Sequence, residues 1–224
     1  MTDAIKIDVW SDIACPWCYI GKRNLEKGLA ATADDDDAPR VDITYHSYEL
    51  SPDTPVDFAG DEIDFLAGHK GMPRQQIVEM LERVTGVAAD AGLAYRFDLL
   101  QHTNTVKAHE LLHFAKGQGM QTEMAERLMA AYFTEGRHVG RIDDLVELAV
   151  EAGLDGEAAR VALESGRHLD DVRADQQQAA AYGIQGVPFF VIDGRYGVSG
   201  AQPADAFAQI ARQVWAERTQ TAPA

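Results

Sequence analysis

The sequence predicts an α/β fold in which a four-stranded sheet and its helices are interrupted by a large all-helical insertion. Three observations support this. Residues 5–10 alternate apolar and polar side chains, as a strand does. Residues 73–182 contain helical patterns separated by glycines. An Asp-Gly pair at 193–194 lies between two strand-like runs, which is typical of a β-hairpin.

The first elements form a β-α-β unit. After the strand at residues 5–10, Pro16 is suited to the first turn of a helix, because no backbone donor is needed there. This helix extends to about residue 31, and residues 41–48 form a second strand. Strands joined in this way are parallel, with a right-handed connection.

The middle of the chain is helical. Pro73 begins a helix with Ile77, Met80, Leu81 and Val84 on one face. Further helices are predicted at residues 105–116, 121–135, 142–152, 156–164 and 169–182. We expect most of these helices to form one lobe that packs on the sheet.

The last part of the chain is a β-β-α unit. Residues 187–192 and 195–199 are the two strands of the hairpin, and Pro203 begins the final helix. The predicted divisions are residues 1–52 and 181–224 for the two halves of the sheet domain, and residues 53–180 for the helical insertion.

Composition excludes several functional classes. The 224 residues carry a net charge of -16, so a nucleic-acid backbone would be repelled. No stretch resembles the roughly 20 apolar residues of a membrane span. Residues 1–6 lack a basic segment followed by an apolar core, so we expect a cytoplasmic protein. The oligomeric state is not predicted.

The two cysteines carry the predicted chemistry. Cys15 and Cys18 are three positions apart at a strand-to-helix turn, and a second CxxC that would complete a zinc site is missing. The helix N-terminus favours a thiolate at Cys15. Cys15 therefore exchanges with a substrate through a mixed disulfide, which Cys18 resolves. No metal and no cofactor besides this disulfide is expected, although glutathione could be a co-substrate.

Residues around the pair have assigned roles and open alternatives. Pro16 stiffens the turn, and Trp17 either offers an apolar face to substrate or is simply exposed. Asp12 relays a proton to Cys18, caps the helix, or is solvated. A cis peptide bond before Pro188 would bring Val187 beside the cysteines, where its backbone could pair with an extended substrate.

The chain resembles DsbA-like oxidoreductases of the FrnE type. The similar segments are residues 12–23 around the cysteines, Asn104-Thr105 with Ala108-His109, residues 183–192, and residues 198–203. The resemblance covers nearly the whole chain. It implies a thioredoxin fold with a helical insertion, and thiol:disulfide oxidoreductase or disulfide isomerase activity on proteins or small molecules. It carries Cys15, Cys18 and a cis-Pro188 over as functional residues.

Two features set this sequence apart from periplasmic DsbA, which has a leader and a histidine inside its CxxC. Trp17 replaces that histidine, so we expect a less oxidising couple. The alternative function is that of glutathione-dependent enzymes resembling kappa-class transferases and 2-hydroxychromene-2-carboxylate isomerases. Those enzymes typically have serine in place of Cys15, lack Cys18, and have an acidic residue near Gln202. These differences favour dithiol exchange.

A competing motif lies at residues 109–113, where His109, Glu110 and His113 match the H-E-x-x-H signature of zinc proteases. Lys116 and Gly119 stand where the longer signature would have its glycine and its third histidine ligand. A downstream acid such as Glu135 is the alternative third ligand, but we interpret both histidines as ordinary helix residues. A third hypothesis is a non-enzymatic holdase that binds partners through the apolar surface near Trp17.

Overall fold

The computed structural model describes residues 4–33, 35 and 38–221. Residues 1–3, which begin the segment on which the expectation of a cytoplasmic protein rests, lie outside these ranges. The sheet has the order β2-β1-β3-β4, with β2 parallel to β1 and the other pairs antiparallel. Its strands are β1 (Ile5–Ser11), β2 (Val41–Ser47), β3 (Phe189–Ile192) and β4 (Tyr196–Ser199). The predicted β-α-β and β-β-α units are both present.

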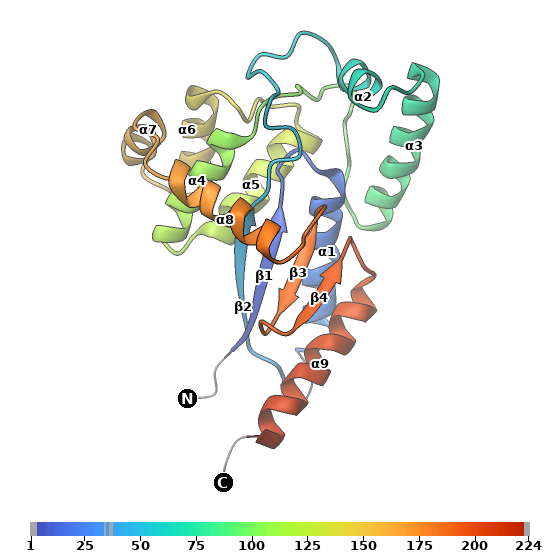
Figure 1. Cartoon of the computed structure of the whole chain (residues 1–224), viewed down its shortest axis with the longest axis vertical. Helices are drawn as coiled ribbons and strands as arrows, with labels where there is room; N and C mark the ends of the chain where they lie inside the picture. The colour runs from blue at the N-terminus through green and yellow to red at the C-terminus, as the bar shows by residue number, and fades with distance from the viewer. Residues whose placement is uncertain (1–3, 34, 36–37, 222–224) are drawn as a thin grey trace.

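Helices cover both faces of the sheet (Figure 1). The structure contains α1 (Pro16–Ala30), α2 (Glu62–Lys70), α3 (Arg74–Asp90), α4 (Val106–Gly117), α5 (Gln121–Thr134), α6 (Ile142–Glu151), α7 (Gly156–Glu164), α8 (Leu169–Ala181) and α9 (Ala204–Thr221). Ile5, Ile7 and Val9 of β1 belong to the core shared with α1 and α9. Trp10 points to the other face, where it packs with Ala179 of α8. The alternation read from the sequence therefore matches one buried face and a second face that is exposed at Lys6 and buried at Trp10.

The structure corrects two predictions. Helix α2 was not predicted, because its residues have no clear apolar stripe. A capping box stabilises its start instead: the Asp61 side chain accepts from the Asp64 amide, and Asp64 accepts from the Asp61 amide. The strand predicted from residue 187 begins only at Phe189, because Pro188 has no amide to donate to a ladder.

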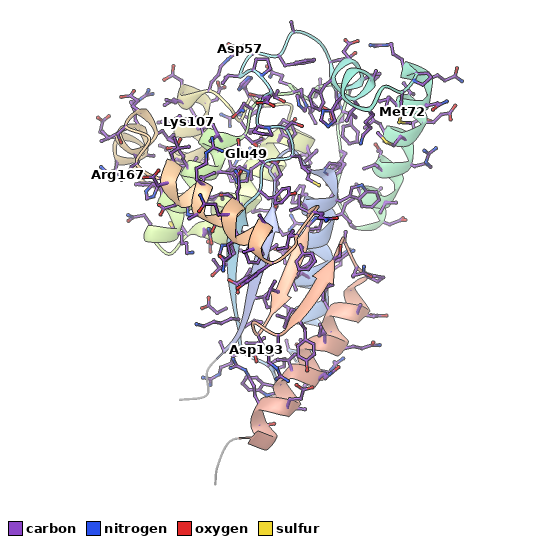
Figure 2. The ribbon with its side chains drawn as sticks, in the orientation of Figure 1. Glu49, Asp57, Met72, Lys107, Arg167 and Asp193 are labelled. Atoms are coloured by element: carbon purple, nitrogen blue, oxygen red, sulfur yellow. The ribbon has the colours of Figure 1, made fainter. Side chains whose placement is uncertain are left out.

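The β3–β4 hairpin turns at the predicted Asp-Gly pair. Asp193 and Gly194 both have positive φ, at 57° and 65°, and the Arg195 amide donates to the Ile192 carbonyl across them at 3.1 Å. The returning strand, predicted from residue 195, begins only at Tyr196, which pairs with Ile192. Asp193 lies at the end of the sheet remote from α2–α7 (Figure 2) and accepts a hydrogen bond from Arg218. In the described parts of the chain, no helix combines the length and apolar character needed to cross a bilayer.

A partly buried charge network joins α1 to the insertion. Lys22 is 3% exposed, and its ammonium lies 2.6 Å from Glu126 of α5. Glu126 also accepts from Tyr19 at 2.6 Å and pairs with Arg23. Burial alone would raise the pKa of Glu126, but hydrogen bonds from Arg23, Lys22 and Tyr19 outweigh it and hold that pKa at about 2. The carboxylate therefore stays charged well into acid.

We predict that Glu126 makes the fold acid-sensitive. A carboxylate whose pKa is depressed by folding stabilises the protein above its unfolded pKa, and this stability is lost as pH falls through the folded pKa. The free energy of unfolding, measured with denaturant, should therefore fall by about 1–2 kcal/mol more in wild type than in Glu126→Gln between pH about 4.5 and about 2. This figure is discounted for the partial exposure of Glu126.

The matched control for this prediction is Glu123→Gln, an exposed position on the same helix. Its unfolding free energy should follow that of wild type throughout the acid range. Identical pH dependence in the two variants would show that Glu126 is not the linked group.

Candidate active site

The two cysteines lie at the N-terminus of α1. Cys15 is the N-cap residue, with φ -92° and ψ 113°, and Pro16 occupies the first turn. The amide of Cys18 donates to the carbonyl of Cys15 at 3.0 Å. The first turn of α1, which the structure describes completely, has no acidic residue that would oppose a thiolate.

Access to the cavity distinguishes the two thiols. Both are buried, with Cys15 4% and Cys18 2% exposed, but only Cys15 lines the cavity. Burial, followed by the hydrogen bond and charge of Cys15, raises the pKa of the Cys18 thiol well above its ordinary value. Cys15 is thus placed to meet a substrate, and Cys18 remains protonated behind it.

The Val187–Pro188 peptide bond is cis, and it lies beside the cysteines. The Cys15 thiol donates to the Val187 carbonyl at 3.6 Å. The carbonyl of Pro188 accepts from the Gly200 amide at 2.8 Å, which holds this segment against the end of β4. A Cβ at Gly21 would lie 3.0 Å from Pro188 Cγ, so glycine at this position lets α1 approach the proline closely.

Asp12 is buried directly before the cysteine motif. Its Oδ1 accepts from Thr105 at 2.9 Å and from the Ala14 amide at 3.2 Å, and its Oδ2 accepts from the Leu50 amide at 2.8 Å. Burial alone would raise the pKa of this carboxyl, but His109 and these donors outweigh it and lower the pKa. This geometry favours a structural role for Asp12 over a proton relay to Cys18, which stays a prediction.

The two histidines of the H-E-x-x-H motif lie against different carboxylates. His109 is fully buried, and its Nε2 lies 3.3 Å from Asp12 Oδ1. The Nε2 of His113 lies 3.0 Å from Asp175 of α8 and 3.1 Å from the hydroxyl of Ser47. Within residues 4–33, 35 and 38–221, no three His, Cys, Asp or Glu side chains are grouped so that they could hold a metal ion.

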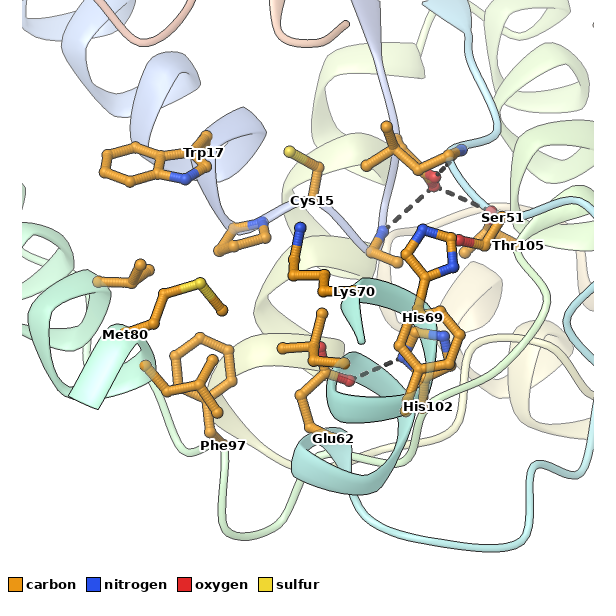
Figure 3. A pocket seen from close by; sticks show the side chains of 18 of the residues that line it. Cys15, Trp17, Ser51, Glu62, His69, Lys70, Met80, Phe97, His102 and Thr105 are labelled. Atoms are coloured by element: carbon orange, nitrogen blue, oxygen red, sulfur yellow. Dashed lines mark hydrogen bonds and ion pairs between the residues drawn. The ribbon is translucent and has the colours of Figure 1, made fainter. Parts of the chain in front are cut away.

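A cavity of about 390 Å³ lies between the cysteine motif and helices α2 and α3 (Figure 3). Cys15, Pro16 and Trp17 line one side, and Trp17 remains 41% exposed. The hydroxyl of Tyr95 donates to the carbonyl of Pro16 at 2.7 Å, which fixes the turn from the insertion side. The sequence indicated Pro16 and Trp17, but it gave no signal for the residues of α2 that complete the cavity.

Comparison with known proteins identifies relatives along nearly the whole chain. The family model described as the DSBA-like thioredoxin domain matches residues 6–211. Bacillus subtilis YwbO, an uncharacterised protein, is 30% identical over 207 residues, which cover 91% of this chain and 94% of YwbO. The crystal structure of the probable DsbA oxidoreductase SCO1869 from Streptomyces coelicolor is 40% identical. It has a TM-score of 0.87 and covers 98% of this chain and 92% of its own.

More distant solved structures share the fold. The cytosolic disulfide reductase DsbM from Pseudomonas aeruginosa has a TM-score of 0.65 at 21% identity, covering 93% and 98% of the two chains, and it has also been solved with GSH. A 2-hydroxychromene-2-carboxylate isomerase has a TM-score of 0.71 at 14% identity, covering 97% and 100%. The predicted thioredoxin fold is confirmed, and the protein belongs to the DSBA-like thioredoxin domain family.

Proposed function

We propose that the protein is a thiol:disulfide oxidoreductase that works through the Cys15–Cys18 dithiol. The observation that carries this proposal is the position of Cys15, which caps a helix N-terminus and borders both a cavity and the Val187 carbonyl. A helix N-terminus is a position that favours a nucleophilic sulfur, and the cavity lets a substrate reach it. Substrates are proteins or small molecules that contain a thiol or a disulfide.

The exchange takes place in two steps, in each of which one disulfide bond forms and one breaks. The Cys15 thiolate attacks one sulfur of a substrate disulfide, which forms a mixed disulfide and releases one substrate thiolate. Cys18 loses its proton and attacks the Cys15 sulfur, which forms the Cys15–Cys18 disulfide and releases the second substrate thiolate. Two electrons pass from protein to substrate, and the reverse sequence oxidises a substrate dithiol. The raised pKa of Cys18 keeps the second thiol unreactive until Cys15 is engaged.

One structural likeness and the cysteine content of the chain support a reducing role in the cytoplasm. The distant fold neighbour DsbM is described as a cytosolic disulfide reductase, and this chain has two cysteines in 224 residues. A protein with no further cysteines has no structural disulfide to maintain in a reducing compartment. We therefore propose that electrons flow mainly from Cys15 and Cys18 to substrate disulfides.

The glutathione-dependent alternative is less well supported. Its enzymes have an acidic residue near position 202 to bind the glutathione amine. Here Gln202 donates through its side chain to the Ser199 carbonyl at 2.8 Å. An amide in this position offers no negative charge to an ammonium group. The solved complex of DsbM with GSH supports glutathione as a co-substrate of the exchange.

We predict that the dithiol titrates as one two-electron couple. Protein equilibrated in glutathione redox buffers, then alkylated and weighed by mass spectrometry, should pass from two modified thiols to none in a single transition. Cys15→Ser should abolish the transition. Cys18→Ser should accumulate a mixed disulfide with glutathione, whereas a transferase would keep turning over in this variant. Thiols that stay inert in the folded protein would refute dithiol exchange.

We also predict unequal reactivity of the two thiols. Limited alkylation of the reduced protein should modify Cys15 first, because only Cys15 lines the cavity and because burial raises the pKa of Cys18. In Cys15→Ser, alkylation of Cys18 should require a pH above the ordinary thiol pKa of about 8.5, or unfolding. Fragment-ion mass spectrometry distinguishes the sites. Preferential modification of Cys18 would reverse the assigned roles.

Asp12→Asn separates the structural role of Asp12 from a relay. Loss of a carboxylate that bonds to Leu50, Thr105 and His109 should lower the unfolding free energy by about 2–4 kcal/mol. The rate of resolution by Cys18 should keep its wild-type pH dependence. The exposed Asp42→Asn is the matched control. A shifted pH profile with little loss of stability would instead establish the relay.

A further inference from the structure

The cavity beside Cys15 has an apolar wall supplied mainly by the helical insertion (Figure 3). Met80 and Phe97 lie on this side of the cavity in the close view. The apolar lining residues of the insertion are Phe65, Leu66, Met80, Leu81, Val84 and Phe97. A ligand that fills this space removes its own apolar surface and that of the wall from water, which is favourable. The wall therefore favours a substrate with an apolar body.

The acidic side chains that face the cavity already have partners. Glu62 accepts from His102 Nδ1 at 2.7 Å, and both residues are more than nine-tenths buried. Asp12 lies against His109 and accepts from Thr105. These carboxylates are satisfied from within the protein, so they need no cation from a substrate.

Lys70 is different: it is an exposed residue, and its side chain extends to the cavity without an acidic partner among the described residues. It is the last residue of α2, and Gly71, with φ 63°, ends the helix directly after it. Its side chain lines the cavity and extends toward the region between Cys15 and His69 (Figure 3). Among the residues that the structure describes, none forms a hydrogen bond or ion pair with Lys70. In a chain of net charge -16, carboxylates are abundant, yet none is placed against this ammonium.

We propose that the cavity selects small disulfides and thiols that combine an apolar body with a carboxylate. Lys70 binds the carboxylate, the wall around Met80 and Phe97 packs on the apolar body, and Cys15 exchanges with the sulfur. This inference rests on the proposed dithiol exchange and adds no further covalent step. The volume of about 390 Å³ suits a small molecule, since such ligands occupy pockets of roughly 300–1,000 Å³.

A charge series of simple disulfides tests the role of Lys70. Reduced Cys18→Ser protein, which stops at the mixed disulfide, is mixed with dithiodipropionate, hydroxyethyl disulfide or cystamine, which are anionic, neutral and cationic. Rates of mixed-disulfide formation, measured by acid quench and mass spectrometry, are divided by the rates of the same reagents with free dithiothreitol. The normalised rate should be highest for dithiodipropionate.

Adding Lys70→Gln should lower the ratio of the anionic to the neutral rate by about fivefold, as expected for loss of one partly exposed ion pair. The matched control is Lys116→Gln, which removes the same charge from an exposed position outside the cavity and should leave the ratio unchanged. An equal ratio with and without Lys70 overturns the inference while exchange itself stands. Failure of all three reagents to form a mixed disulfide overturns the proposed function.

The apolar wall has its own test. With Met80→Gln, the rate for the aromatic dianion dithiobis(nitrobenzoate), relative to aliphatic dithiodipropionate, should fall by roughly threefold to tenfold. Val87→Gln, an exposed position on the same helix outside the cavity, is the control and should keep the wild-type ratio. A ratio that does not respond to Met80→Gln overturns the apolar half of the proposal.

Discussion

The arrangement of the active site depends on one buried carboxylate, that of Asp12. It accepts hydrogen bonds from the cysteine turn through Ala14, from the chain after β2 through Leu50, and from the start of α4 through Thr105. A buried charge without such donors is strongly unfavourable, so the three segments must be in place together. The helical insertion therefore helps to build the turn that carries the cysteines, and it also covers that turn. His109 belongs to the same constraint, which explains its burial inside a motif that resembles a zinc site.

Much of the fold could be predicted because local patterns and tertiary contacts agree. The alternation in residues 5–10 places Ile5, Ile7 and Val9 on one buried face, and the Asp-Gly pair adopts the positive φ values that its turn requires. The location of the cysteine pair could be predicted for a similar reason: the spacing of Cys15 and Cys18 and the position of Pro16 specify a helix N-terminus by local chemistry alone. Family resemblance added the cis peptide before Pro188.

The remaining features depend on contacts between distant residues. Helix α2 has little amphipathic character, and its stability comes from the Asp61–Asp64 capping box and from stacking of Phe65 on His102, with ring centroids 3.4 Å apart. Phe65 and His102 lie too far apart in the sequence for one local pattern to include both rings. Likewise, the partners of Asp12 lie 38 and 93 residues away in the chain. The position of Lys70 at the cavity follows only once α2 is placed over the cysteines.

One feature on the far side of the sheet has an optical consequence. Trp10 stacks on His46 with ring centroids 4.5 Å apart and an interplanar angle of 15°. Burial would lower the pKa of His46, but hydrogen bonds to Asp175 and Asp8 outweigh it and raise that pKa. A protonated imidazole stacked on an indole quenches its fluorescence, so we expect the emission of Trp10 to rise when His46 loses its proton. Trp17 lies beside the cysteines at a half-exposed site. We therefore expect Trp10 to report on pH and Trp17 to report on the state of the two cysteines, although these tryptophans are only seven positions apart in the sequence.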